Sequence, residues 1–116
     1  MIKAASEFIT EARSQCDCLD ADAAKALYDQ SDNAFIIDVR EPTEVNTAKL
    51  NDSNNIPRGM LEYKTPDLCP DPSTTIFTHC AGGGRAALSA ARLQEMGYTD
   101  VHVIAAKFDE IKETFG

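Results

Sequence analysis

The sequence predicts an α/β fold: an open, mostly parallel sheet of about five strands with helices on both faces. Short apolar runs, as at residues 34–39 and 101–104, alternate with longer segments of helical periodicity. The run at 34–39 is continuously apolar up to Asp38, which is typical of a strand covered on both faces. The chain has 116 residues, enough for a single core, so residues 1–116 are expected to form one domain.

The first expected element is a helix at about residues 3–14. Its apolar residues recur at helical spacing and are expected to pack on the rest of the domain. These residues are Phe8, Ile9 and Ala12. A short strand at residues 15–19 follows.

A second helix is expected from about residue 21 to residue 30. Asp20 is placed to cap it, because an aspartate at this position accepts a hydrogen bond from a free amide of the first turn. Its expected buried stripe is Ala23, Ala24, Leu27 and Tyr28. A turn at residues 31–33 then leads into the strand at 34–39.

The middle of the chain is expected to hold short helices and loops. Pro42 suits the first turn of a helix at about 43–49, because its fixed φ is already helical. Another short helix is expected at about 60–64. Residues 65–74 contain three prolines and are expected to be a surface loop.

The segment from Thr75 to Met96 reads as strand, tight loop and helix. The loop has the sequence C-A-G-G-G-R and starts at Cys80, and the helix starts near Arg85 and ends before Gly97. Its residues available for burial are Leu88, Ala91, Leu93 and Met96. A strand at 101–104 and a helix at about 108–115 complete the chain.

This loop is the candidate site, with Cys80 as the nucleophile. Three glycines allow successive amides to turn toward one point, and the first turn of the helix adds free amides and a positive dipole end. We therefore expect the Cys80 thiol to ionise more readily than that of a free cysteine, and the thiolate is the reactive form. The expected anion-binding residues are Ala81, Gly82, Gly83, Gly84 and Arg85. The alternative is a buried, inert cysteine beside a simple glycine turn.

Four segments together resemble the rhodanese (sulfurtransferase) domain family. They are C-A-G-G-G-R, I-I-D-V-R-E-P at 36–42, I-P-R-G-M-L-E-Y at 56–63 and L-Q-E-M-G-Y-T-D-V at 93–101, in the family's order over most of residues 19–115. The resemblance implies a rhodanese-like fold and a sulfurtransferase that uses a Cys80 persulfide. Sulfur would pass from thiosulfate or another persulfide donor to a thiol or cyanide. Arg58 would border the site as a second anion contact, or form an exposed salt bridge with Glu62.

Asp38 and Arg40 follow a strand, near the sheet edge where ligands gather in open α/β folds. The favoured interpretation of both is structural, with an ion pair between Arg40 and Glu44 fixing the loop. His79 adjoins Cys80, but strand alternation is expected to point it to the opposite face, so it is not expected to be the base. His102 has no evident partner.

Two segments depart from the family's pattern. Residues Ala48 to Ser53 stand where relatives have Gly-His-Ile-Pro-Gly-Ala, although Asn and Asp at 51–55 tolerate the positive φ of a turn. Ala105 to Lys107 replace glycines that many relatives have beside the catalytic loop, and alanine restricts the backbone. Their effect on activity is open. The alternative function is therefore a non-enzymatic binding or sulfur-carrier module with this fold.

Loop length argues against another rival. The nearest enzymatic alternative is a cysteine phosphatase or a related arsenate reductase, and these enzymes have five residues between cysteine and arginine. Here four intervene, and the tighter ring suits one sulfur atom better than a tetrahedral oxyanion. A phosphatase or arsenate reductase is the less favoured function.

The composition of the chain limits the classes of partner that it can bind. The net charge of −8 argues against nucleic acid, because an acidic surface repels phosphates. No segment is long enough for a membrane span and no secretory signal is evident, so a cytoplasmic location is expected. Cys16, Cys18 and Cys69 lack the spacing of a zinc site or disulfide scaffold, and their roles are open. We expect no metal or cofactor; the expected partners are small sulfur-containing anions or protein persulfides, with any protein partner unknown.

Overall fold

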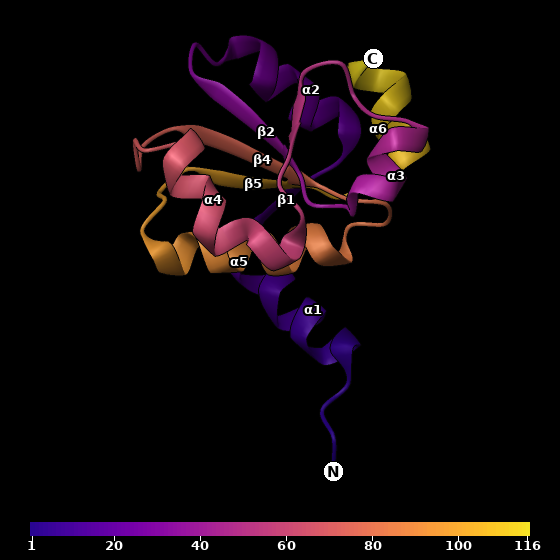
Figure 1. Ribbon diagram of the computed structural model, residues 1–116, viewed down its shortest axis with the longest axis vertical. Coiled ribbons are helices and arrows are strands. Elements are labelled where there is room, and N and C mark those ends of the chain that lie inside the picture. Colours follow the sequence, from indigo (N-terminus) through magenta and orange to yellow (C-terminus); the bar gives the residue numbers. More distant parts are fainter.

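The computed structural model describes residues 1–116 and is built on a five-stranded parallel sheet (Figure 1). The strands are β1 (Asp17–Leu19), β2 (Ala34–Asp38), β3 (Ser53–Asn55), β4 (Thr75–His79) and β5 (Val101–Ile104). Their order across the sheet is β1-β5-β4-β2-β3, and every neighbouring pair is parallel. The predicted open, parallel α/β sheet is confirmed.

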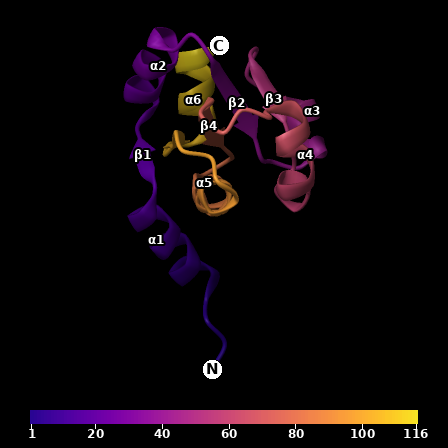
Figure 2. The ribbon, with the colours of Figure 1, turned by 90° about the vertical axis from the view of Figure 1, so that its left-hand side faces the viewer.

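Helices cover both faces of this sheet (Figure 2). They are α1 (Ala5–Gln15), α2 (Ala21–Gln30), α3 (Pro42–Thr47), α4 (Leu61–Leu68), α5 (Gly84–Met96) and α6 (Phe108–Phe115), with a 3₁₀ turn η1 (Arg58–Met60) before α4. α2 and α6 pack together on one face, while α5 lies on the other face with α1 and α4 against it. α1 therefore packs on the domain, as predicted.

The core is divided between the two faces of the sheet. Ile37 and Val103 contribute to the cluster under α4 and α5, whereas Ile36, Phe77 and Ile104 contribute to the cluster under α2 and α6. Neighbouring residues on a strand point to opposite faces, and here both faces are buried. This explains why β2 is continuously apolar until its last residue.

Most predicted elements are found, with two errors in their buried faces. α2 and α6 have the predicted bounds, and Asp20 Oδ1 accepts a hydrogen bond from the Ala23 amide at 2.8 Å. Ala23 is exposed, however, because α2 turns Ala21 and Ala24 to the core instead. Met96 is also exposed, since it lies in the last turn of α5, beyond the face buried at Leu93.

The predicted proline-rich loop begins later than expected. α4 continues to Leu68 and contains Pro66, so only the stretch from Cys69 to Thr74 connects α4 to β4. Leu61 and Thr65, one turn apart, are both fully buried. Burial of this face holds the helix together past the residue that interrupts its hydrogen bonding.

The fifth strand is one that the sequence did not locate. β3 pairs with β2 at the sheet edge, where a run of polar residues gives no apolar signal. Asn55 Nδ2 donates to the backbone oxygens of Asp38 and Arg40, each at 2.9 Å. No residue other than glycine has a positive φ, so the segment makes its turn without the left-handed conformation that asparagine was expected to supply.

None of the helices has the length and apolarity that a membrane crossing requires.

We predict that Asn55→Ala lowers the free energy of unfolding by about 1–2 kcal/mol, because the Arg40 oxygen loses its side-chain donor and the Asp38 oxygen keeps only the Ile56 amide. The matched control is Asn54→Ala. Asn54 is exposed and its single bond to the Ile36 oxygen is longer, at 3.3 Å, so its change should stay within about 0.5 kcal/mol. Urea unfolding of both variants measures the difference, and equal losses would contradict this account of the edge.

Candidate active site

Cys80 lies at the carboxyl end of β4, one of the three inner strands of the sheet. Its residue is 2% exposed, and it belongs to the core cluster under α5. Ala81 and Gly82 follow on the surface, and Gly83 turns the chain into α5. The sequence therefore places a buried sulfur at the base of a loop that is open to solvent.

One loop amide binds the sulfur directly. The Gly83 N–H donates to Cys80 Sγ at 3.0 Å. Gly83 is the N-cap of α5 and has φ +96°, in the left-handed region where glycine is favoured. Of the three glycines, Gly83 is the one whose backbone conformation needs the missing Cβ, and that conformation carries the hydrogen bond to sulfur.

Further donors surround the same loop. The amides of Ala81 and Gly82 have no acceptor in the protein. The first-turn amides of α5, which begins at Gly84, have no intrahelical acceptor either. Of the predicted ring of amides, only the Gly83 amide donates to the cysteine sulfur. The other loop amides can therefore bind a second atom.

The loop is held in place from both sides. The Phe108 N–H, at the start of α6, donates to the Ala81 oxygen at 3.0 Å. Thr78 Oγ1 donates to the Ala86 oxygen at 2.9 Å, which ties the first turn of α5 to β4. Ala105 and Ala106 lie just before α6, and neither needs a positive φ. The replacement of glycine in this segment is therefore compatible with the loop's geometry.

Arg85 forms an ion pair with a carboxylate. Its guanidinium donates to both oxygens of Glu44 in α3, at 2.7 and 3.0 Å. The hydrogen bond from Arg85 lowers the pKa of Glu44 to about 2. Glu44 Oε1 also accepts from the Glu41 amide at the start of α3. Arg85 thus fixes α3 beside the loop, and its charge is compensated there.

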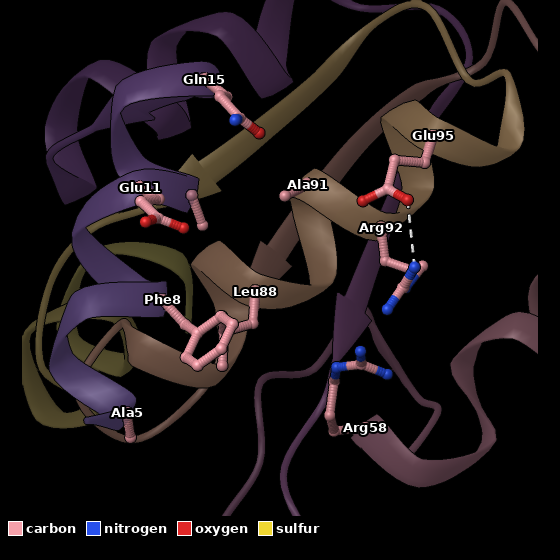
Figure 3. A pocket seen from close by; sticks show the side chains of 10 residues that line it. Ala5, Phe8, Glu11, Gln15, Arg58, Leu88, Ala91, Arg92 and Glu95 are labelled. Atoms are coloured by element: carbon pink, nitrogen blue, oxygen red, sulfur yellow. Dashed lines mark hydrogen bonds and ion pairs between the residues drawn. The ribbon is translucent and has the colours of Figure 1, made fainter. Parts of the chain in front are cut away.

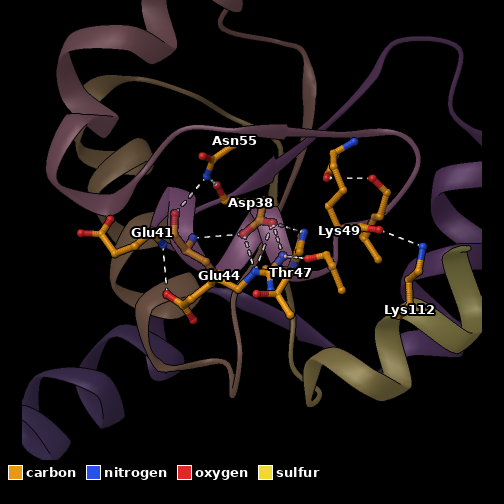
Figure 4. Close-up of polar contacts among 12 residues, drawn as sticks. Asp38, Glu41, Glu44, Thr47, Lys49, Asn55 and Lys112 are labelled. Atoms are coloured by element: carbon orange, nitrogen blue, oxygen red, sulfur yellow. Dashed lines mark hydrogen bonds and ion pairs between the residues drawn. The ribbon is translucent and has the colours of Figure 1, made fainter.

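The predicted ion pair between Arg40 and Glu44 is wrong. Arg40 instead donates to both oxygens of Asp38 (labelled in Figure 4), with Nη2 to Oδ2 at 2.8 Å, and to the Ala48 oxygen at 2.7 Å. Asp38 and Arg40 are both buried, so each compensates the other's charge, whereas Glu44 is turned toward Arg85. Through its bond to Ala48, Arg40 holds the start of the segment at 48–53, and Asp38 holds Arg40.

His79 faces away from Cys80, as strand alternation predicted. Its ring is fully buried, stacks on Phe108 at an interplanar angle of 28°, and has no hydrogen-bond partner for either nitrogen. Burial lowers the pKa of His79 to about 4, although the Asp38 carboxylate 3.8 Å away opposes this change. His79 is therefore a neutral core residue at pH 7. His102, by contrast, lies between the carboxylates of Asp17 and Asp100.

Arg58 forms the salt bridge with Glu62 that was its alternative assignment, at 3.1 Å. It lines a hollow of about 440 Å³ between α1 and α5, where Phe8 and Leu88 form part of the wall and Arg92 lies beside Arg58 (Figure 3). This hollow includes neither Cys80 nor a residue of its loop. Arg58 forms no hydrogen bond or ion pair with a side chain of the loop, and its predicted role as a second anion contact stays a prediction.

The other cysteines are free thiols with different environments. Cys69 is buried at the end of α4, and Cys16 is partly buried against the cluster that contains Cys80. Cys18 is exposed on β1. Burial raises the pKa of both Cys16 and Cys18 above the ordinary value, which reduces their reactivity at neutral pH.

Sequence reasoning missed one charged residue beside the loop. Arg13, in α1, has Nη2 3.5 Å from the point where a Cβ on Gly83 would lie. One turn earlier, Ile9 Cδ1 lies 3.0 Å from the corresponding point on Gly84. The apolar face of α1 was predicted, but nothing in its sequence indicated which loop it would contact.

Known proteins are similar to this chain over most of its length. The family model described as "Rhodanese-like domain" matches residues 20–114. A chloroplastic rhodanese-like/PpiC domain-containing protein 12 from Arabidopsis thaliana is 35% identical over 75 residues, which are 63% of this chain and 25% of that protein. The chain thus spans about a quarter of this curated relative.

Two solved structures are similar over most of the chain. A protein of unknown function from Rhodopseudomonas palustris, named a possible tyrosine phosphatase, has a TM-score of 0.86 and 28% identity, covering 100% of this chain and 94% of its own. A thiosulfate sulfurtransferase from Pseudomonas aeruginosa has a TM-score of 0.78 and 26% identity, covering 91% of this chain and 20% of its own.

We predict that Gly83→Ala lowers the free energy of unfolding by about 1–2 kcal/mol, because alanine is strained at positive φ. Gly82→Ala is the matched control. Its φ lies outside the left-handed region and no atom lies within 4 Å of the added Cβ, so its effect should stay within about 0.5 kcal/mol. Denaturant midpoints of the two variants test the pair. Tolerance of alanine at 83 would show that the loop does not depend on this conformation.

We also predict that stability falls as the pH drops from 6.5 toward 4, by an amount on the order of 3 kcal/mol. The pKa of folded His79, about 4, lies below its ordinary value, so the unfolded chain binds the extra proton in this window. Glu44, whose pKa is lowered to about 2, gives a further loss only below about pH 4.5. His79→Gln should flatten the slope between pH 6.5 and 4.5. Thermal melting across this pH range measures the slope. An unchanged slope in the variant would show that a group other than His79 causes the pH dependence.

Proposed function

The chain belongs to the rhodanese-like domain family, and from this premise we propose that it is a sulfurtransferase working through a persulfide on Cys80. The proposed donors are thiosulfate or another sulfane-sulfur compound, including protein persulfides. The proposed acceptors are thiols or cyanide. The observation that carries the proposal is the hydrogen bond from the Gly83 amide to Cys80 Sγ, at the head of α5.

The first step is a displacement at the donor's outer sulfur. The Cys80 thiolate attacks the sulfane sulfur of thiosulfate and a new S–S bond forms. The S–S bond within thiosulfate breaks, and its electron pair leaves with sulfite. Cys80 then carries an anionic persulfide, and no proton, metal or outside oxidant is needed for the balance.

The loop supports this step through its arrangement of donors. Gly83 holds the sulfur, and the outer persulfide sulfur would lie one bond further out, near the amides of Ala81 and Gly82 that have no protein acceptor. The positive end of α5 favours the same negative charge. Donors that are already oriented stabilise a developing anion without reorganisation, and one such donor is typically worth about a hundredfold or more in rate.

The second step returns the enzyme to its starting state. A thiolate or cyanide attacks the outer sulfur, the S–S bond to Cys80 breaks, and its electron pair remains on Cys80 as thiolate. The product is a new persulfide or thiocyanate. The exposure of Ala81 and Gly82 supports access by an acceptor, including one carried on another protein.

The experiment described below distinguishes sulfur transfer from two other functions. A module that carries sulfur without turnover would accept one sulfur from a donor but would release it no faster than the uncatalysed reaction. A phosphatase, as the name of the Rhodopseudomonas palustris protein suggests for that protein, would hydrolyse a phosphate ester. The four-residue spacing between Cys80 and Arg85, and the pairing of Arg85 with Glu44, favour a single sulfur over a tetrahedral anion.

We predict that the purified protein gains the mass of one sulfur atom after incubation with thiosulfate, and that cyanide removes it with stoichiometric formation of thiocyanate. Cys80→Ser should abolish the gain. Cys18→Ser is the matched control, because Cys18 is exposed but lies outside the loop, and it should behave as the parent protein does. Intact-protein mass spectrometry and a thiocyanate assay provide the readouts.

Sulfur transfer that survives Cys80→Ser would remove Cys80 from the mechanism. Hydrolysis of an aryl phosphate that is lost in the same variant would replace the proposal with a phosphatase.

A further inference from the structure

Four of the five arginines of the chain are paired with carboxylates, although the proposed donor is an anion. Arg85 is bound to Glu44, Arg40 to Asp38, and Arg58 to Glu62. Arg92, further along α5, is bound to Glu62 and Glu95. The chain as a whole carries a net charge of −8, which repels an approaching anion. A cation without a carboxylate partner near the loop would therefore decide how well an anionic donor is drawn in.

Lys107, exposed just before Phe108, is one such cation. Arg13 is another, and it lies beside Gly83. It is exposed, and it is the one arginine of the five in the chain that forms no ion pair. Its Nη2 atom lies 3.5 Å from the Cβ position of Gly83, and the amide of Gly83 lies 3.0 Å from Cys80 Sγ. Standard bond lengths then place the guanidinium within about 10 Å of the sulfur. This is about one Debye length at 0.1 M ionic strength, so its field is felt there.

The position of Arg13 is set by packing. α1 packs against α5 at an angle (Figures 1 and 3), and Ala12 is its buried residue. Ile9 contacts the loop at Gly84, one turn before Arg13. This contact fixes the rotation of α1, so that Arg13, four residues later on the same side of the helix, reaches Gly83.

We propose that Arg13 is a donor-binding residue, supplied by α1, that gives the site its preference for anionic sulfur donors. The inference rests on the proposed sulfur transfer for its substrate, but the field of Arg13 at Cys80 exists without it. α1 precedes the residues matched by the family model, which begin at residue 20, so Arg13 is an addition to the matched domain. Its planar, permanently charged guanidinium suits an oxyanion such as the sulfonate end of thiosulfate.

The experiment compares two alkylating reagents at one sulfur. Iodoacetate is an anion and iodoacetamide is neutral, and both react with the same thiolate. The ratio of their rates at Cys80 therefore reports the local electric potential and cancels any change in ionisation. Peptide mass spectrometry follows Cys80 separately from exposed Cys18. The variants are Arg13→Gln and Arg13→Lys, with Lys3→Gln as the control. Lys3 precedes α1 and is paired with Glu11, and its replacement changes the net charge equally.

We expect Arg13→Gln to lower the iodoacetate-to-iodoacetamide ratio about threefold at low salt, from the loss of one charge at this distance. Arg13→Lys should retain most of the ratio, and Lys3→Gln should leave it unchanged. In 1 M salt the difference between Arg13→Gln and the parent protein should disappear, because the Debye length falls to about 3 Å. A difference that persists in 1 M salt would indicate a structural effect and overturn the inference.

The same variants are then assayed with thiosulfate. Arg13→Gln should reduce kcat/KM about tenfold at low salt, mainly through a higher KM, since thiosulfate carries two negative charges. If the parent protein shows no sulfur transfer but the alkylation ratio still falls, the proposed function fails and the role of Arg13 in the site's potential stands. If transfer occurs and Arg13→Gln matches Lys3→Gln in both assays, the inference fails and the proposed function stands.

Discussion

The hydrogen bond from Gly83 to the sulfur of Cys80 is the interaction on which the site depends. It requires a residue without a Cβ at φ +96°, a helix that starts at the next residue, and a strand that ends just before the cysteine. The surrounding contacts serve this junction: Phe108 holds Ala81, Thr78 holds Ala86, and Ile9 contacts Gly84. The sulfur is buried, while the loop that would receive a second sulfur stays on the surface.

The sequence predicted the elements with strong local signals and missed those that depend on distant partners. The glycine run, the caps at Asp20 and Gly97, and the apolar strands are local, and each is found. β3 is polar and forms because it pairs with the free edge of β2. No hydrophobic periodicity in the sequence therefore indicated it. Sequence spacing alone predicted that Arg40 pairs with Glu44. In the fold, Arg40 is buried beside Asp38 and pairs with it, and Glu44 pairs with Arg85 of α5.

The paired arginines of this protein stabilise the fold, and other groups remain to bind an anion at the site. Four arginines are held by carboxylates and join elements to one another: Arg40 and Arg85 fix the segments around the loop, while Arg58 and Arg92 line the neighbouring hollow. Such pairs add little net field at the sulfur, because each positive charge has a negative one beside it. What remains for recognition is the backbone of the loop, the positive end of α5, and the single unpaired arginine of α1.

The most direct test of the account is a crystal structure of the protein after reaction with thiosulfate. We predict a second sulfur bonded to Cys80 Sγ, with the Gly83 amide still donating to Sγ and the outer sulfur within hydrogen-bond distance of at least two other amides among residues 81–85. An unmodified Cys80, or an outer sulfur that no amide of the loop contacts, would contradict the claim that this backbone is arranged to hold a persulfide.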